Sequence, residues 1–404
     1  MAEGILAMSV KERDRLLVLR QVECKALLLK EAAERLGVSY RQAKRLWAAY
    51  GRRGATGLVH GLRGQHSNRR VDEGVVSEAL RLYREHYWDF GPTLAAEKLA
   101  EVHGIDINRE TLRRRLHEAH LLVTGRLSRV HRRARTRRSQ FGALVQMDGS
   151  HHAWFEDRAP KCCLMVMVDD ATGRAEAFFS REETTQGAFA LLRRWVERWG
   201  VPQSLYMDRK SVYRPEREPN AQERAQGSLA QSDFGRACFR LGIQTIFARS
   251  PQAKGRVERM NGTLQNRLVK ELRLRGISDM DTANAFLPQF LDSLNAKFAV
   301  EPASAVNGHR LRPGAEDLNE VFCHEKQRAL RQDYTFRCGS LHVQITRQKP
   351  LPRPGTRLTV RFCHDGTLKI LHGEMPLEFR LIGHQTNQVV PSLPPGEGRN
   401  NSPA

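Results

Sequence analysis

The front part of the chain has the hydrophobic spacing of helices, most clearly from Leu28 to Trp47. Alanines and leucines recur there on one face of each of two helices, Gly37 provides the turn between them, and Ser39 is suited to cap the second. Small residues at the crossing of two helices are typical of the helix-turn-helix. We predict a helix-turn-helix DNA-binding domain over residues 8–65 and a second, looser copy over residues 70–123.

The exposed face of the second helix in each copy is basic. In an ordinary helical hairpin such a face is merely solvated, whereas in a helix-turn-helix it meets DNA. The residues expected to contact DNA from these helices are Tyr40, Arg41, Gln42, Lys44, Arg45, Arg113 and Arg114. An Arg-rich linker is predicted over residues 124–140, and its Arg132 and Arg133 are expected to contact phosphates, with a solvated tether as the alternative.

Short apolar segments of strand length replace the helical spacing in the middle of the chain. They lie at residues 143–147, 162–168, 175–180 and 204–207, and a helical pattern covers residues 185–199. Strands followed by helices indicate a mixed α/β domain, which we place over residues 141–300.

The C-terminal part combines short strands with glycine and proline turns. A charged connector is predicted over residues 301–330, a small β-barrel over residues 331–385, with a β-sandwich as the alternative, and a disordered tail over residues 386–404. The predicted fold class is therefore multidomain, with N-terminal all-α helix-turn-helix modules, a central α/β core and a C-terminal small β-barrel.

Composition narrows the possible partners. The chain has 404 residues and a formal net charge of +21, of which residues 1–140 carry +13. Clustered basic charge favours a polyanion such as a nucleic-acid backbone. No apolar run approaches the roughly 20 residues that cross a bilayer, so no membrane partner is expected. With no secretory leader, and with seven scattered cysteines that form no CxxC pair, a cytoplasmic protein without a zinc ribbon is expected.

Three acidic residues stand where an α/β domain would bring them together. Asp148 ends the first predicted strand of the central domain, Asp208 ends another, and Glu258 lies near the start of a predicted helix. Grouped carboxylates repel one another and need a cation. Oxygen ligands suit Mg²⁺ or Mn²⁺, and two such ions support in-line phosphoryl transfer. We predict that these three acids are catalytic and bind two metal ions.

The helix that carries Glu258 has an apolar stripe and a neighbouring polar stripe. The apolar stripe is expected to pack on the core, and the polar stripe to meet DNA. Lys254 and Arg259 are expected to contact phosphates or a terminal base, and Asn261 to position the DNA end. Taken alone, Glu258 would be interpreted as a solvated glutamate paired with a nearby arginine, and only the combined pattern reverses this preference.

The run SPQAKGRVER at residues 250–259, with Asn261 and Gln265 after it, resembles the third-acid helix of DDE transposases with a retroviral-integrase-type core. MDGS at 147–150, VDDATGRA at 168–175 and MDRKSVYR at 207–214 precede it in the expected order. From about residue 8 to 385, the chain is similar to ISNCY-type insertion-sequence transposases.

This resemblance implies an RNase H-like integrase core that cuts 3′ ends and transfers strands with Mg²⁺, using Asp148, Asp208 and Glu258. It also implies that the helix-turn-helix region binds double-stranded terminal inverted repeats, and that target DNA is a second partner. Two active sites must meet two DNA ends, so at least a homodimer on DNA is expected, associated with the nucleoid.

Two other classes stay open at this point. A DNA-binding regulator derived from an inactive transposase would keep the acids only as structural residues. An RNase H-like nuclease of structured nucleic acids would act without matching repeats at the ends. Asp169 and Asp170, which follow a predicted strand, are expected to form turn hydrogen bonds rather than to catalyse.

Overall fold

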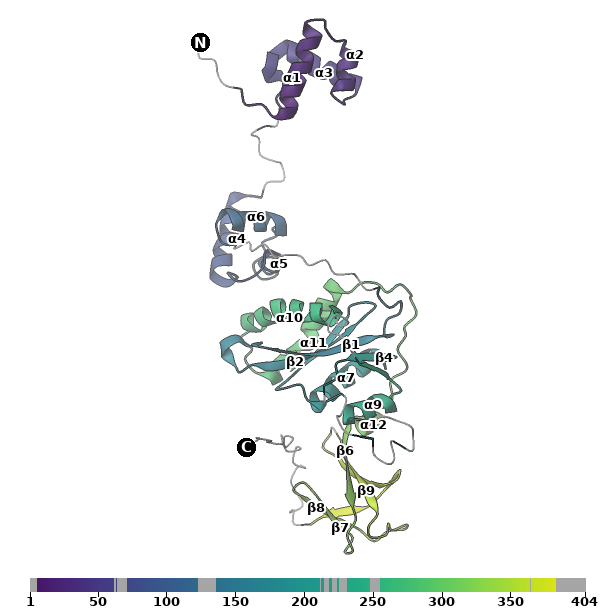
Figure 1. Cartoon of the computed structure of the whole chain (residues 1–404). Coiled ribbons are helices and arrows are strands. Elements are labelled where there is room, and N and C mark those ends of the chain that lie inside the picture. The colour runs from purple at the N-terminus through teal and green to yellow at the C-terminus, as the bar shows by residue number, and fades with distance from the viewer. Residues whose placement is uncertain are drawn as a thin grey trace, which may run out of the picture. The chain divides into compact units, whose positions relative to one another are not determined.

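The computed structural model describes residues 6–61, 63, 71–122, 136–210, 212–213, 218–219, 224, 231–247, 255–363 and 365–382 (Figure 1). The chain divides into two units, Met1–Arg126 and Leu127–Ala404. Most of the predicted Arg-rich linker, including Arg132 and Arg133, lies outside the described residues, as do Lys254 and the tail over residues 386–404.

The first helical module comprises α1 (Val10–Glu23), α2 (Leu29–Arg35), α3 (Tyr40–Arg53) and a 3-10 turn, η1 (Gly54–Leu58). The turn between α2 and α3 uses Gly37 in the left-handed region, at φ 62°, where only glycine is unstrained. The Ser39 hydroxyl accepts a hydrogen bond from the Gln42 backbone N–H at 3.2 Å and caps α3. The two predicted helices are therefore present, and DNA binding by this module stays a prediction.

The second helical module comprises α4 (Glu73–His86), α5 (Pro92–His103) and α6 (Arg109–Glu118). Gly104 ends α5 in the left-handed region, and the Asn108 side chain caps α6 by accepting a hydrogen bond from the Glu110 N–H at 2.9 Å. Leu99, Leu112 and Leu116 are fully buried in its core. This module thus has its own hydrophobic core.

A five-stranded sheet forms the centre of the second unit. Its strands are β1 (Val145–His152), β2 (Cys162–Asp169), β3 (Ala175–Ser180), β4 (Ser204–Met207) and β5 (Gln244–Phe247), in the order β3-β2-β1-β4-β5. The pairs β1–β2 and β2–β3 are antiparallel, whereas β1–β4 and β4–β5 are parallel. The predicted mixed α/β core is confirmed, although β5 was not expected.

Helices cover both faces of this sheet (Figure 1). On one face, α7 (Thr185–Trp199) and α9 (Asp233–Arg240) share a core with inward residues of β1 and β4, such as Met147 and Leu205. On the other face, α10 (Gly255–Leu274) and α11 (Met280–Phe298) pack on β2 and β3. The short turn η2 (Glu156–Arg158) lies between β1 and β2. A layer of helices on each side explains why β2 is buried along its whole length.

Two asparagines of α11 cover the outer edge of β3. Asn295 accepts from the Ala175 N–H at 2.8 Å and donates to the Ala175 carbonyl at 2.9 Å. Asn284 does the same for Phe179, at 2.7 and 3.0 Å. Each side-chain amide makes the backbone hydrogen bonds that a neighbouring strand would make. The N–H and carbonyl groups of Ala175 and Phe179 are therefore not available for pairing with another chain.

The C-terminal part differs from the predicted barrel. Its elements are α12 (Ala315–Val321), β6 (Cys323–Ala329), β7 (Thr335–Cys338), β8 (Leu341–Ile345), β9 (Arg357–Cys363), β10 (Leu368–His372), β11 (Met375–Pro376) and β12 (Phe379–Leu381). They form a four-stranded sheet, β11-β10-β9-β6, and a separate three-stranded sheet, β12-β8-β7. The two sheets share one core that includes Phe336, Val343 and Val360. No closed barrel forms among the described residues, because no strand joins the two sheets into one ladder.

The segment expected to be a connector, residues 301–330, instead contains α12 and β6 and is fastened to α9. Glu325 of β6 accepts from Arg240 and Arg361 at 2.7 Å each, and Arg236 lies 3.4 Å away. Burial by itself would raise the pKa of Glu325, but these three arginines outweigh it and the pKa is lowered. The C-terminal sheets are thus tied to the core by a largely buried ionic cluster.

Candidate active site

Polar side chains on β1 alternate with core residues and face α10. Three rungs join the two elements: the Val257 N–H donates to Gln146 at 3.2 Å, the Asn261 amide to Asp148 Oδ2 at 3.3 Å, and the Gln265 amide to Ser150 at 3.1 Å. Two residues of a strand advance about 6.6 Å and four residues of a helix about 6 Å. The spacing of the polar residues on β1 therefore matches their spacing on α10. This ladder places Asp148 against the polar stripe of α10.

Asp208 follows directly after β4, the strand that neighbours β1. β1 and β4 are parallel, and their last pair is Gln146 with Tyr206. Continued by two residues, this register would bring Asp148 and Asp208 level on the same face, with strands roughly 4.8 Å apart. Asp208 Oδ1 accepts from the Lys210 backbone N–H at 3.2 Å, and the Lys210 ammonium lies 3.5 Å from Oδ2.

Glu258 is exposed in the first turn of α10. It stands three residues before Asn261, so both project from the same side of the helix, and Asn261 touches Asp148. The predicted apolar stripe of α10 is confirmed, since Val257, Leu264 and Leu268 are all fully buried.

Across the described part of the chain, no three His, Cys, Asp or Glu side chains are close enough to hold a metal ion. The donor set nevertheless suits a hard cation: carboxylates on adjacent strands stand beside the Asn261 amide oxygen, which is buried and accepts no hydrogen bond from the described residues. Asp148, Asp208 and Glu258 would be the residues to hold such an ion, and this ligand set stays a proposal.

Sequence reasoning missed Glu183, a fourth carboxylate at this site. It lies between β3 and α7 with a side chain only 5% exposed, and it forms an ion pair with the Lys210 ammonium. Burial lowers the pKa of Lys210, but Glu183, Asp208 and Asp148, in that order, outweigh burial and raise it. The two-residue spacing of Lys210 from Asp208 is a weak signal for Lys210, and nothing in the sequence indicates Glu183.

A second network fixes the start of α10. Asp170 is fully buried and accepts from the Arg138 N–H at 2.8 Å, the Gln146 amide at 3.2 Å and Arg256 Nε at 2.7 Å. Asp169 accepts from the Gly142 and Thr172 N–H groups at 2.9 and 2.7 Å. The expected turn role is confirmed for Asp169, which binds Thr172 three residues on. Asp170 instead makes long-range contacts and anchors the turn of α10 that carries Glu258.

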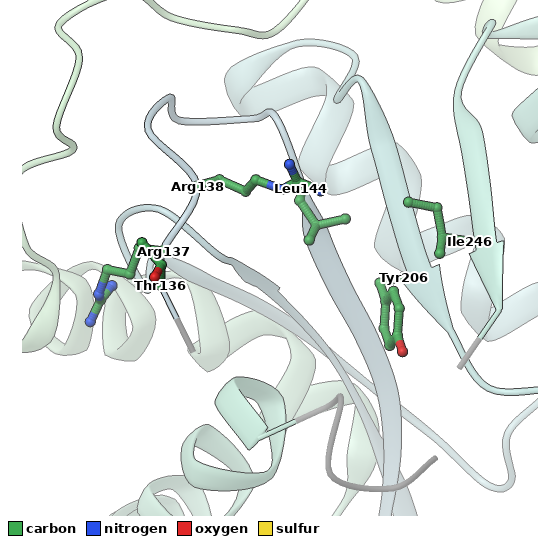
Figure 2. A pocket seen from close by; sticks show the side chains of 6 residues that line it. All are labelled: Thr136, Arg137, Arg138, Leu144, Tyr206 and Ile246. Atoms are coloured by element: carbon green, nitrogen blue, oxygen red, sulfur yellow. The ribbon is translucent and has the colours of Figure 1, made fainter. Parts of the chain in front are cut away.

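A pocket of about 480 Å³ opens on the same sheet face, over β4 and β5. Figure 2 shows its lining, with Tyr206 and Ile246 on the strands, Leu144 before β1, and the segment Thr136–Arg138 at the side. Tyr206 precedes Asp208 by two residues on the same face, so the pocket adjoins the acids.

Positive charge gathers beside this pocket. The pKa of Arg137 is lowered, first by burial and then by the neighbouring charges of Arg256 and Arg259. Asp170 and Asp169 partly offset this repulsion, and Arg256 is paired with Asp170 at 2.7 Å. The positive charge of Arg137 and Arg259 still favours an anion such as a phosphate.

The predicted DNA-contact residues of the helical modules differ in their surroundings. On α3, Tyr40, Arg41, Lys44 and Arg45 are exposed and Gln42 is half-buried, and the helix contains no acid. On α6, Arg113 is bound to Glu110, with a shortest distance of 2.6 Å, and Arg114 lies 3.8 Å from Glu118. The basic face of α3 is thus less neutralised than that of α6.

The α/β core with acids on one sheet face, together with separate basic helical modules, is typical of nucleic-acid-processing enzymes. No protein-family model matches the chain. The chain is 43% identical over 335 residues to "Putative transposase y4bF" of Sinorhizobium fredii (strain NBRC 101917 / NGR234), covering 82% of this chain and 72% of that protein. It is 27% identical over 345 residues to "Transposase for insertion sequence IS1202" of Streptococcus pneumoniae, covering 76% and 73%. The chain therefore belongs to the insertion-sequence transposases.

Among solved structures, those of retroviral integrases are similar to this chain. The HTLV-2 integrase catalytic core domain in complex with magnesium has 22% identity and a TM-score of 0.29, covering 39% of this chain and 89% of that chain. The simian T-cell lymphotropic virus intasome in complex with PP2A regulatory subunit B56 gamma has 17% identity and a TM-score of 0.33, covering 74% and 97%. These scores are low, and the family assignment depends on the sequence relatives alone.

Proposed function

We propose that this transposase is a DDE enzyme that binds the terminal inverted repeats of its element, cleaves 3′ ends and transfers them into target DNA. The observation that carries the proposal is that Asp148 on β1 and Asp208, directly after the parallel neighbour β4, both lie near Lys210, while Asp148 also contacts the helix that carries Glu258. In-line phosphoryl transfer at a metal centre requires carboxylates that lie close enough together to share the metal ions.

Asp148, Asp208 and Glu258 would hold Mg²⁺ or Mn²⁺, with two ions expected. When bound, such ions activate the attacking oxygen and stabilise the leaving one. The residues of the chain bind and orient: Asn261 holds Asp148 at 3.3 Å, and the Asp170–Arg256 pair holds the start of α10. Arg259, which is exposed, would contact the DNA end beside these acids, whereas Asn261, expected to contact it too, is buried and orients Asp148 instead.

The DNA strand would continue from the acids into the pocket on β4 and β5. A step of two strand residues is about 6.6 Å, close to one nucleotide of an extended strand. Tyr206 offers a ring for stacking, and Arg137 and Arg138 offer charge for phosphates. The nucleotide next to the scissile phosphate is the group that fits there.

The helix α3 would read the terminal repeats in the major groove through Tyr40, Arg41, Gln42, Lys44 and Arg45. Arg113, Arg114, Arg132, Arg133 and Lys254 would add contacts to the backbone of the DNA. Two ends must be joined, so at least a homodimer on DNA is expected, acting at the nucleoid in the cytoplasm.

The test uses the full chain and duplexes that end in the inverted repeats flanking its coding region. Asp148→Asn, Asp208→Asn and Glu258→Gln should each abolish Mg²⁺-dependent cleavage and leave end binding intact, whereas Asp157→Asn, at an exposed site, should cleave normally. Retained cleavage in any of the three would refute that residue's role. Binding without cleavage by the unaltered chain would instead favour a regulator derived from an inactive transposase.

A further inference from the structure

We propose that Glu183 is a positioning residue for strand cleavage: it holds the ammonium of Lys210 away from Asp208 and so leaves Asp208 able to bind metal. This inference rests on the proposed function, in which Asp208 is a catalytic acid. Neither the resemblance to transposases nor the three acids of the triad includes Glu183.

The first step is that the position of Glu183 is tightly restricted. Its side chain is 5% exposed, and a Cβ on Gly149, the residue after Asp148, would lie only 2.6 Å from its Oε2. Cys163 of β2 lies beside the same spot, 3.1 Å from that added Cβ. The lack of a side chain at Gly149 is what lets this carboxylate approach the strand of Asp148.

The second step is that Glu183 binds the ammonium of Lys210. A buried carboxylate without a counter-charge is strongly unfavourable, so the ammonium of Lys210 is held at Glu183 Oε2. The other oxygen, Oε1, is buried and accepts no hydrogen bond from the described residues. Burial and then the charge of Glu183 raise the pKa of Cys163 to about 12, which reflects the negative potential at this point.

The third step is that Lys210 touches both oxygens of Asp208. Its backbone N–H donates to Oδ1 at 3.2 Å, and its ammonium lies 3.5 Å from Oδ2. The ammonium is thus shared unequally, in direct contact with Glu183 and at a longer distance from Asp208. Most of the counter-charge of Lys210 therefore stays with Glu183 rather than with Asp208.

Removing the charge of Glu183 would shift the ammonium of Lys210 from Glu183 to Asp208. In Glu183→Gln, the ammonium of Lys210 has Asp208 as its nearest carboxylate and competes there with a divalent ion. We expect metal affinity to fall by about tenfold, the size of one charge-assisted hydrogen bond. In Glu183→Gln with Lys210→Met, the competing ammonium is gone, and affinity should return to at least the original value.

The experiment measures Mn²⁺ binding to the full chain by the electron paramagnetic resonance signal of free Mn²⁺, alongside Mg²⁺ titrations of cleavage. Glu182→Gln, at the exposed neighbouring position, is the matched control and should bind Mn²⁺ normally. Recovery of binding in the double variant is a result that a merely structural role for Glu183 would not produce.

Unchanged Mn²⁺ affinity in Glu183→Gln would overturn the inference, as would a double variant that binds no better than Glu183→Gln. If Glu183→Gln does not fold, the double variant decides, because it carries no unpaired buried charge. Binding weaker than the original then refutes the inference. Asp208→Asn separates the two proposals, since unaltered metal binding and cleavage in that variant would refute the proposed function itself.

Discussion

Two groups of acids on the same sheet have opposite surroundings. Asp169 and Asp170, after β2, are fully buried and accept hydrogen bonds from backbone and side-chain donors, the shortest at 2.7 Å. Asp148 and Asp208 are partly exposed, with contacts of 3.2 to 3.5 Å to Asn261 and Lys210. The first group stabilises the fold, and the second is placed to bind something from outside. The prediction that Asp148 ends its strand was wrong, since β1 continues to His152. Burial and donor geometry, rather than a place at a strand end, distinguish the two roles.

The largest expected effect is on catalysis by the exposed group. Asp148→Asn should lower the rate of Mg²⁺-dependent cleavage by on the order of a thousandfold, because it removes a negative ligand from the proposed metal centre. The midpoint of thermal unfolding should change little, since Asp148 is not a buried ionic anchor. Cleavage assays and calorimetry on the same preparation measure the rate and the unfolding midpoint. A large loss of stability would show that Asp148 is a structural acid like Asp169 and Asp170.

Next in size is the stability effect of the buried group. Asp170→Ala leaves Arg256 without its buried partner, 2.7 Å away, and should lower the free energy of unfolding by about 3 to 5 kcal/mol. Urea denaturation measures this change. Cleavage should fall as well, because the start of α10 loses its anchor. If Asp170→Ala kept full stability and still lost cleavage, Asp170 would have a role in catalysis, as proposed for Asp148 and Asp208.

The pocket beside the acids should have an intermediate effect. Tyr206→Ala should weaken binding of a DNA end that has an unpaired terminal nucleotide by about 1 to 3 kcal/mol, the usual value of a stacked base. Tyr206→Phe keeps the ring and serves as the control. Fluorescence anisotropy with labelled ends measures the difference, and equal affinities for both variants would show that no base stacks there.

The smallest expected effect concerns pH and a histidine of the structural part. Burial lowers the pKa of His309 from its usual value near 6.5 to about 4, and the Trp195 indole N–H donates to its Nε2 at 3.0 Å. A histidine that is neutral when folded adds stability above pH 6.5, and that contribution is lost as the pH falls toward 4. The unfolding midpoint should therefore drop over this range in the original chain and drop less in His309→Gln. His151→Gln, on the exposed part of β1, should behave like the original chain.

Much of the α/β core could be predicted from the sequence because its signals are local. The apolar spacing of residues 257–268 indicates the buried face of α10, and the caps Ser39 and Asn108 start α3 and α6 where expected. β5 was missed because it is only four residues long and mostly half-buried, so it lacks a clear alternation. Strand spacing could not decide between the predicted barrel and its alternative, a sandwich, because it does not tell which strands will pair; the two separate sheets on one core correspond to the alternative.

The amino-acid sequence by itself determined many of the helices and strands, though not β5, α12 or β6, together with the basic front part and the membership of Asp148, Asp208 and Glu258 in one predicted domain. Only the tertiary structure decided which acids are anchored and which face outward. Asp170 meets Arg256 across 86 positions of sequence, and Glu183 meets Lys210 across 27. Such pairs form when strands and helices pack, and the burial that fixes their roles does not exist in the unfolded chain.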